Sequence, residues 1–381
     1  MKKYLFIPVF FLLLLHGCKE SDIHQTERSQ EEMYFEDYES PEFKWGFIDL
    51  SGDIAIPARF DHVSKFSDGA AAVNYKGKWG YVDRIGNFLV EPSYKSAYPM
   101  QEGWARVIDF EQKFSFVNKR NESLSFELAN EAGNFSSGLV RIRMGYTWGF
   151  ANDKGDMVID PQFEKAWDFE GDYAKVKNGS HYGLIGKSGN IIIPIEYNKI
   201  WPPSNGIVVV KKNEAYFALN TNNEILLGPF QNLTRFHNSV AAARMNDEYV
   251  LIDTEGRTIS KRYENIRYAE QDRWVARKFG KLGVLSSTGE ELSPFAYQQI
   301  NNYSDDFAVF SQSNLWGYLD INGNEVIEAA FGLAWDFHNG YARAGFREGM
   351  AFINTDMQLA FAPRYIDIQD FTEGLAAVQL P

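Results

Sequence analysis

A unit of about 34 residues recurs ten times from Lys44 to the C-terminus, and this repeat constrains the fold more than any other feature. Its most recognisable position, called the Trp position below, is a Trp that Gly often follows. At intervals of 33 to 35 residues this position holds Trp45, Trp79, Phe114, Trp148, Tyr182, Tyr216, Tyr249, Leu282, Trp316 and Met350. A chain with so constant a period builds its core by stacking copies of one small unit.

Each unit has the pattern of three short antiparallel strands. In the second unit these are a run of small residues (Ala71–Tyr75), an alternating segment that starts at the Trp position (Trp79–Asp83) and a third strand around Phe88–Val90. Alternating apolar and polar residues are typical of a strand with two different faces. Asp83 caps the second turn through its own backbone, and Gly86 supplies the positive φ of a tight hairpin.

The repeated segments resemble the WG-repeat family, whose units share a Lys-Trp-Gly-aromatic-aliphatic-Asp core. This core stands at Lys44–Asp49 and Lys78–Asp83, and less fully at Trp316–Asp320. The resemblance extends over residues 44–381. The third, sixth, seventh and tenth units lack the Gly and carry Ser115, Phe217, Val250 and Ala351 in its place.

The two ends of the array predict a closed fold. The array starts inside a unit, at the Trp strand Lys44–Asp49, and ends with a small-residue strand, Leu375–Leu380. Pairing of these two strands would close a ring and leave no sheet edge exposed, as in a propeller. We therefore predict an all-β fold of ten 34-residue repeats that forms a closed, propeller-like toroid. An open solenoid of β-hairpins is the alternative.

The N-terminus has the pattern of a bacterial lipoprotein signal. The basic residues Lys2 and Lys3 precede an apolar run, Tyr4–Leu15, which is too short to span a bilayer and fits a signal peptide. The sequence from Leu15 to Cys18 then resembles a lipobox, and Cys18 is the only cysteine of the chain. This resemblance implies cleavage before Cys18 and attachment of lipid to its thiol.

These features divide the chain into three parts. We expect a signal peptide at 1–17, a lipidated Cys18 with a flexible acidic tether at 18–43, and the repeat domain at 44–381. The expected location is the outer membrane of the bacterial cell envelope. Lys19–Asp22 resembles a signal that sends some lipoproteins to the cell surface.

The composition excludes several classes of function. A formal charge of −13 argues against a nucleic-acid partner, which needs clustered Lys and Arg. The six histidines show no metal-site spacing, and no nucleotide-binding or nucleophile motif is present. We therefore expect a monomer with no cofactor, no metal and no catalytic residue. Abundant carboxylates leave a glycosidase-like pair open.

One variable position suggests a binding face. It lies two residues before the second aromatic of each unit, and we name it the aromatic slot. It holds Ser64, Tyr98, Trp167, Trp201, Thr234, Arg267, Asn301, Trp335 and Gln369. Such variety is typical of a position that faces solvent, where aromatic rings can stack on sugars or anchor a protein. The candidate binding residues are Tyr98, Trp167, Asp168, Trp201, Trp335 and Asp336. The alternative is that these side chains pack between neighbouring units.

Three functions follow from these patterns. The first is a cell-envelope lipoprotein whose repeat body binds a protein or glycan partner. The second is a structural scaffold of the envelope without a small ligand. The third is a repeat-fold hydrolase. A cleft with two or more carboxylates would favour the third, and a binding experiment would separate the first two.

Overall fold

The computed structural model describes residues 38–346, 349–361 and 365–380, which consist of strands joined by turns. Tyr38–Pro381 is one compact unit, and the following description concerns this unit, called the body. Cys18, the predicted signal peptide and the tether up to residue 37 lie outside the described residues. Within the described ranges no helix is long and apolar enough to cross a membrane.

The strands form ten antiparallel sheets, which we number as blades 1 to 10 by the Trp positions that they contain. Blade 1 contains β35 (Asp367–Ile368), β36 (Leu375–Leu380), β1 (Lys44–Asp49) and β2 (Ile54–Phe60); blade 2, β3 (His62–Val63), β4 (Ala71–Tyr75), β5 (Lys78–Val82) and β6 (Phe88–Tyr94); blade 3, β7 (Ser96–Ala97), β8 (Trp104–Ile108), β9 (Phe114–Asn118) and β10 (Ser123–Leu124). Blade 4 contains β11 (Ala129–Ser136), β12 (Leu139–Met144), β13 (Thr147–Ala151) and β14 (Met157–Phe163); blade 5, β15 (Lys165–Ala166), β16 (Tyr173–Asn178), β17 (His181–Gly186) and β18 (Ile191–Tyr197); blade 6, β19 (Lys199–Ile200), β20 (Ile207–Lys212), β21 (Ala215–Asn220) and β22 (Ile225–Phe230). Blade 7 contains β23 (Asn232–Leu233), β24 (Val240–Met245) and β25 (Glu248–Asp253); blade 8, β26 (Asn265–Tyr268), β27 (Arg273–Lys278) and β28 (Lys281–Ser286); blade 9, β29 (Gln299–Ile300), β30 (Phe307–Gln312), β31 (Leu315–Asp320) and β32 (Glu325–Phe331); blade 10, β33 (Tyr341–Phe346) and β34 (Gly349–Asn354).

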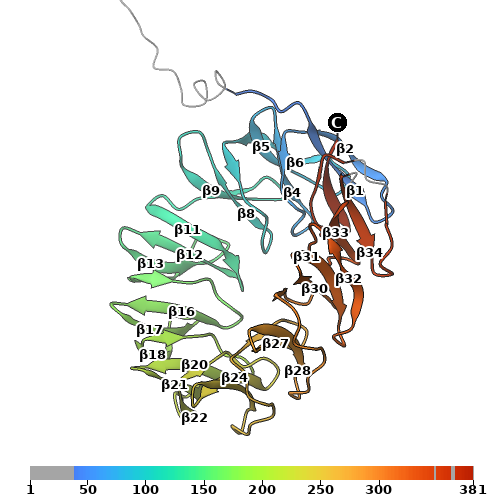
Figure 1. Ribbon diagram of the computed structural model, residues 1–381. Coiled ribbons are helices and arrows are strands. Elements are labelled where there is room, and N and C mark those ends of the chain that lie inside the picture. The colour runs from blue at the N-terminus through green and yellow to red at the C-terminus, as the bar shows by residue number, and fades with distance from the viewer. Residues whose placement is uncertain (1–37, 347–348, 362–364, 381) are drawn as a thin grey trace, which may run out of the picture. The chain divides into compact units, whose positions relative to one another are not determined.

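A complete blade has one strand more than the three predicted. In blade 5 the order is β15-β16-β17-β18, so a strand of two residues precedes the small-residue strand. The third of the predicted strands is the last strand of a complete blade, for example β22 in blade 6 and β32 in blade 9. It lies on the outside of the ring (Figure 1), and we call it the outer strand. The extra strand lies at the opposite edge of the sheet. It was not predicted because two residues carry no periodic pattern.

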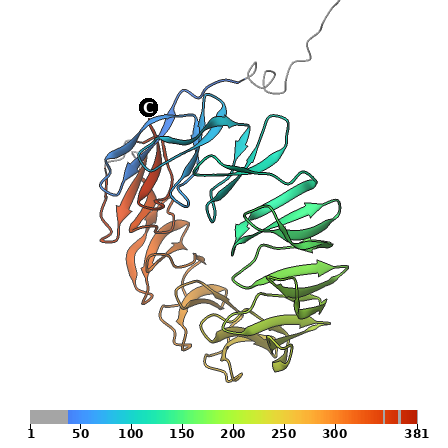
Figure 2. The same ribbon diagram turned by 180° about the vertical axis from the view of Figure 1, so that it is seen from behind.

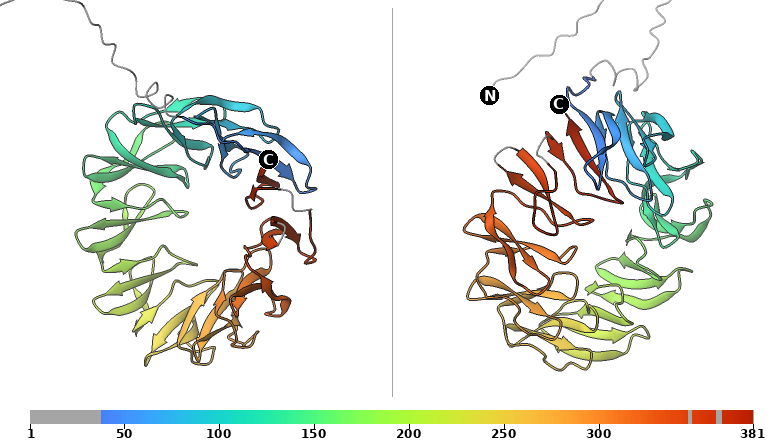
Figure 3. Two further views of the ribbon diagram at one scale, coloured as in Figure 1. Left: turned by 45° about the horizontal axis from the view of Figure 1, so that its top comes forward. Right: turned by 90° about the vertical axis from the view of Figure 1, so that its right-hand side faces the viewer.

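The ring closes through the two strands that the sequence predicted to pair. β36 pairs antiparallel with β1 in one sheet, with Trp45 opposite Gln379, Phe47 opposite Ala377 and Asp49 opposite Leu375. Blue and red strands accordingly share one sheet in Figures 2 and 3. The prediction of an all-β, closed ring is confirmed, and the open solenoid is wrong.

Packing between the blades also shows that the ring is closed. The described core divides into ten clusters, and each lies between two consecutive blades. One of them joins blade 10 to blade 1, where Ile48 packs with Phe352 and Phe371. Ten blades in an open array would have only nine such interfaces. The hydrophobic stabilisation is therefore distributed around a complete ring.

The small-residue strand is small because it is buried on both faces. In β4, Ala71 and Val73 pack into the cluster shared with blade 1, whereas Ala72 and the preceding Ala70 pack into the cluster shared with blade 3. Alternate residues of a strand point to opposite faces, so a strand between two neighbours has no solvent side. Ala and Val fill this space in blade 2, whereas β27 and β30 bury the larger side chains Trp274 and Phe310 at corresponding strands.

The glycine after the Trp position is required by the outer strand. A Cβ atom at Gly80 would lie 2.4 Å from the carbonyl oxygen of Val90, and one at Gly149 would lie 2.3 Å from that of Ile159. The outer strand shows a register irregularity at this point and passes directly over the glycine. At these two positions any side chain would collide with the backbone of the crossing strand.

In the units without this glycine, the outer strand is arranged differently at the residue after the Trp position. Blade 3, with Ser115, has only the two-residue β10 as its outer strand. Blade 7, with Val250, is three-stranded, but so is blade 8, which keeps Gly283. Blade 6 has Phe217, and there the glycine is on the outer strand: a Cβ at Gly228 would lie 2.8 Å from Phe217 Cδ1. The close approach of the outer strand therefore tolerates a large residue after the Trp position, such as Phe217, when the residue opposite it on the outer strand is a glycine, such as Gly228.

Turns between neighbouring blades form a second set of contacts around the ring. The carboxylate of Asp68 accepts a hydrogen bond from the backbone N–H of Gly103, one unit later, at 2.8 Å. The same type of bond joins Asp305 to Gly340 at 2.7 Å. Across the closure, Glu373 accepts from the N–H of Gly69 at 2.9 Å. These bonds tie several pairs of neighbouring blades together at the turn that opens the small-residue strand.

The segment before the first strand is tied to the body by a buried carboxylate. Asp61 is 2 % exposed and accepts hydrogen bonds from Tyr38 Oη at 2.6 Å and Ser40 Oγ at 2.9 Å, and it forms an ion pair with Lys44. Burial by itself would raise the pKa of Asp61, but the bonds from Lys44, Tyr38 and Ser40 outweigh it and hold the pKa below the ordinary value of 3.8.

This network predicts a pH-dependent loss of stability in Asp61→Asn. Because the folded-state pKa is lowered, the ionised carboxylate stabilises the body at neutral pH, and this contribution disappears as the pH falls below 3.8. We expect a loss of about 2 kcal/mol at pH 7, less than for a fully buried pair because Lys44 is partly exposed. Urea unfolding at pH 7 and pH 3 measures it. An equal loss at both values would contradict the role of the charge.

Candidate functional site

The aromatic slot lies next to the short strand at one edge of each blade. Trp167 directly follows β15, and Trp201 directly follows β19. Every residue of the slot is half-buried, so the position is neither open surface nor core. Tyr98, Trp167, Trp201 and Trp335 belong to blades 3, 5, 6 and 10, and only Trp167 and Trp201 come from consecutive blades.

Three aromatic residues of the slot face a cation of the small-residue strand. Lys175 Nζ lies 4.2 Å from the ring centroid of Trp167, and Arg343 Cζ lies 4.7 Å from that of Trp335. Arg106 Cζ lies 4.2 Å from the ring centroid of Tyr98. These are cation–π distances. Burial lowers the pKa of Lys175. Trp201 instead packs on Tyr216, with centroids 6.3 Å apart.

A backbone hydrogen bond explains why an aromatic residue in the slot lies beside a cation of the small-residue strand. The N–H of Trp167 donates to the carbonyl of Lys175 at 3.0 Å, which places the two side chains side by side. Where the strand has Ala instead, the slot holds a small hydroxyl residue, and Ser64 Oγ accepts from the N–H of Ala72 at 2.9 Å. The spacing of eight residues between ring and cation is visible in the sequence and is the signal that could have indicated this pairing.

The two acidic candidates bond to the preceding blade. Asp168 accepts from Arg141 Nε at 2.7 Å, and Asp336 accepts from Asn301 Nδ2 at 3.0 Å. Both therefore join neighbouring blades. Their carboxylates have additional lone pairs, so a structural role leaves room for a further hydrogen bond.

Two cavities border blade 3. Its outer strand β10 pairs only with Phe116 and Val117 of β9, and the chain then turns away. Phe126 packs edge-on against Phe116, with centroids 6.3 Å apart, and a turn leads directly into β11. One cavity of about 500 Å³ lies beside this turn. The other, of about 650 Å³, lies at the opposite end of the blade.

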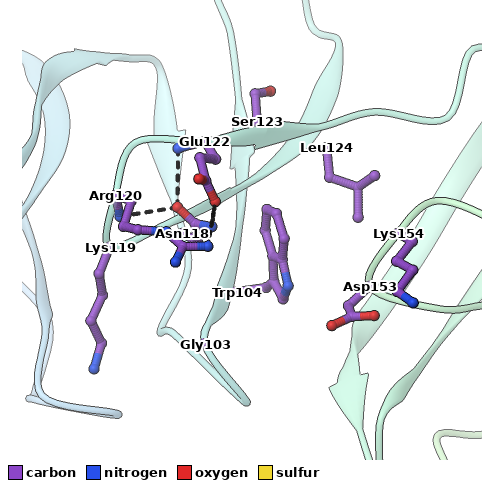
Figure 4. Close-up of a pocket in the computed structure, with 10 residues that line it drawn as sticks. All are labelled: Gly103, Trp104, Asn118, Lys119, Arg120, Glu122, Ser123, Leu124, Asp153 and Lys154. Atoms are coloured by element: carbon purple, nitrogen blue, oxygen red, sulfur yellow. Dashed lines mark hydrogen bonds and ion pairs between the residues drawn. The ribbon is translucent and has the colours of Figure 1, made fainter.

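We name the larger cavity the blade 3 groove. Figure 4 shows its lining, which consists of Gly103, Trp104, Asn118, Lys119, Arg120, Glu122, Ser123, Leu124, Asp153 and Lys154. The side chain of Trp104 stands between the turn of blade 3 and the turn of blade 4. One side of its ring packs against Phe135 at a centroid distance of 6.0 Å and an interplanar angle of 27°. The remaining part of the half-buried ring lines the groove.

One wall of the groove is a rigid polar turn. Asn118 Oδ1 accepts from the N–H groups of Arg120 and Glu122, each at 3.0 Å. The Glu122 carboxylate accepts from Asn118 Nδ2 at 2.6 Å and from Arg120 at 2.8 Å. These two hydrogen bonds, from Asn118 first and Arg120 second, lower the pKa of Glu122. Glu122 is therefore a fixed, ionised acceptor at neutral pH.

The opposite wall carries two exposed charges. Asp153 and Lys154 belong to the turn between β13 and β14, and Figure 4 shows both across from Trp104. Within the ranges that the structure describes, neither side chain forms an ion pair or a side-chain hydrogen bond. Both are consequently available to a ligand.

Sequence reasoning did not select this groove. Trp104 is nevertheless a conspicuous residue, because it is a Trp within the small-residue run Gly103–Val107. The equivalent position in blade 2 holds Ala70, which is 2 % exposed. The described residues contain no group of three or more His, Cys, Asp or Glu side chains that could hold a metal ion.

A family model described as WG containing repeat matches most of the repeat array. The matched residues are 45–79, 79–108, 148–180, 182–216, 283–316, 316–349 and 350–380. The unmatched residues inside the array, 109–147 and 217–282, contain the three units with Ser115, Phe217 and Val250. The departure of blade 3 from the repeat is therefore visible both in sequence and in structure.

Solved structures that resemble the body are β-propellers. A crystal structure of the eukaryotic initiation factor is 11% identical, with a TM-score of 0.50, and the match covers 79% of this chain and 96% of that one. BamB from Moraxella catarrhalis is 12% identical, with a TM-score of 0.33 and coverage of 68% and 96%. At such identities the likeness concerns the fold alone. No curated protein matches the chain.

Proposed function

The chain belongs to the WG-containing repeat family, and from this membership and the blade 3 groove we propose that it is a binding module of the bacterial cell envelope. In this proposal lipid on Cys18 holds the protein on the outer membrane, and the ring presents the groove to a protein or glycan partner. The carrying observation is that two cavities, of about 650 and 500 Å³, lie beside blade 3, which is one of the blades that depart from the repeat.

The residues of the groove support binding. Trp104 offers a partly exposed aromatic ring that is held in place by Phe135, and such rigid rings lose little entropy when they bind a partner. Glu122 and Asp153 supply acceptors on opposite walls, and Lys154 supplies a donor. A purely structural scaffold requires no such combination at a single blade.

The chemistry of the groove favours binding over hydrolysis. Glu122 and Asp153 are two carboxylates beside one cavity, the arrangement that a glycoside hydrolase would need. A general acid in such an enzyme has a raised pKa, because it must remain protonated at working pH. The pKa of Glu122 is shifted in the opposite direction, so Glu122 does not fit the role of the acid. The other carboxylate, Asp153, lies exposed on a turn and not in the apolar pocket that such an acid occupies.

The binding proposal predicts that Trp104→Ala loses its partner. Purified body and the variant are used to capture ligands from envelope extract, and we expect at least a tenfold weaker interaction, about 1.4 kcal/mol. Trp167→Ala is the matched control, because Trp167 is also half-buried but belongs to the aromatic slot of blade 5. If Trp167→Ala loses the partner and Trp104→Ala keeps it, the aromatic slot is the binding face. If neither variant changes the capture of ligands, the hypothesis of a structural scaffold without a ligand is favoured.

Anchoring of the protein predicts a simple phenotype for Cys18→Ala. The basic n-region, the apolar run and the position of the single cysteine support lipidation. We expect the variant to leave the membrane fraction and to lose metabolic labelling with palmitate, since acyl chains supply most of the membrane affinity. Fractionation of cells measures both. A variant that stays in the membrane fraction would contradict the lipoprotein proposal.

A further inference from the structure

We propose that the ligand of the blade 3 groove is a saccharide that stacks on Trp104, an inference that rests on the proposed binding function and names its ligand class. This inference rests on which residue types line the groove. Five of the ten lining residues are charged: Lys119, Arg120, Glu122, Asp153 and Lys154. The centres of protein–protein interfaces are depleted of charged residues and rich in apolar anchors. Here Trp104 and Leu124 are the only large apolar side chains.

A sugar ring fits this combination of groups. Its C–H face packs against an aromatic ring, while its hydroxyl groups are both donors and acceptors around the edge. The groove offers one aromatic ring with acceptors on two sides, Glu122 on the turn of blade 3 and Asp153 on the turn of blade 4. The indole nitrogen of Trp104 lies on the side of Asp153 in Figure 4 and supplies a further donor there.

The groove is also prepared for such a ligand before it binds. Phe135 supports the ring of Trp104, and hydrogen bonds from Asn118 and Arg120 hold the carboxylate of Glu122. Groups that are already fixed lose little conformational entropy on binding. A volume of about 650 Å³ is in the range of small-molecule sites.

The test uses the soluble body, residues 38–381, with chitotriose, cellotriose, maltotriose and xylotriose as probes. NMR spectra of the indole N–H groups are recorded during titration, and Trp104→Phe identifies the Trp104 signal among nine tryptophans. We expect at least one trisaccharide to shift this signal with a dissociation constant below about 1 mM. The indole signal of Trp167 is expected to stay unchanged.

Three variants give the expected order of effects. Trp104→Ala removes the platform and should weaken binding at least about tenfold, while Trp104→Phe keeps a ring and should weaken it only a few-fold. Asp153→Asn leaves folding unchanged, because the exposed carboxylate forms no ion pair within the described ranges, and it should weaken binding about threefold or more.

Two results would overturn the inference. One is the absence of any shift of the Trp104 signal with all four probes at about 10 mM. The other is equal affinity of the wild type and Trp104→Ala. If envelope extract still yields a protein partner that depends on Trp104, the binding function stands and the saccharide class is wrong. If no partner of any kind depends on Trp104, both proposals fail.

Discussion

A chain that ends at Glu373 is expected to be strongly destabilised, because it lacks the strand that closes the ring. β36 pairs with β1 along its whole length, and Leu375, Ala376, Ala377 and Val378 are all buried. Their removal exposes the edge of β1 and opens the clusters shared with blades 2 and 10. We expect the melting temperature to fall by about 10 °C or more.

A pair of point variants separates closure from simple truncation. Val378 is 1% exposed and packs between blades 10 and 1, whereas the neighbouring Gln379 is half-buried. Val378→Asp buries an unpaired charge and should unfold the body, while Gln379→Asp should change the free energy of unfolding by less than about 1 kcal/mol. Calorimetry of the three variants provides the measurement. A truncated chain that melts within a few degrees of the wild type would show that closure contributes little.

Gly149→Ala is expected to destabilise the body by about 3 kcal/mol or more, at the upper end of the range for overpacking. The added Cβ would lie 2.3 Å from the carbonyl oxygen of Ile159 and 2.7 Å from the backbone nitrogen of Pro161. Both are backbone atoms of the outer strand, so no side chain can rotate away. The strand must shift or detach.

Gly332→Ala is the matched control for this prediction. Gly332 has no positive φ, and no atom lies within 4 Å of the position where its Cβ would be. The same substitution there should leave the free energy of unfolding within about 0.5 kcal/mol of the wild type. Urea unfolding compares the two variants. Similar small effects at both positions would mean that the outer strand adapts easily and that steric crowding does not explain the glycine.

Much of the architecture follows from local sequence patterns. The ten Trp positions predicted ten blades, and the partial units at the two ends predicted the pairing of β1 with β36. The Asp and Gly of the second turn also behave as predicted: Asp83 Oδ1 accepts from the N–H of Ile85 at 3.0 Å, and Gly86 has a φ of 88°. These features are legible because strand alternation and tight turns depend on residues within a few positions of each other.

Other features depend on residues that meet only in the folded ring. The reason for Gly80 is the carbonyl of Val90, which the sequence does not place above it. The role of Asp168 as the partner of Arg141 depends on how one blade packs against the next.

The groove beside blade 3 is the clearest example of this limit. It exists because β10 is short and because the turn with Asp153 comes to lie opposite Trp104. The sequence by itself determined the number of blades, the three longer strands of a blade and the closure of the ring, since each is set by short-range pattern and by the two chain ends. Only the tertiary structure decided which side chains face each other between blades, because those contacts are set by packing across units that are about 34 residues apart in the chain.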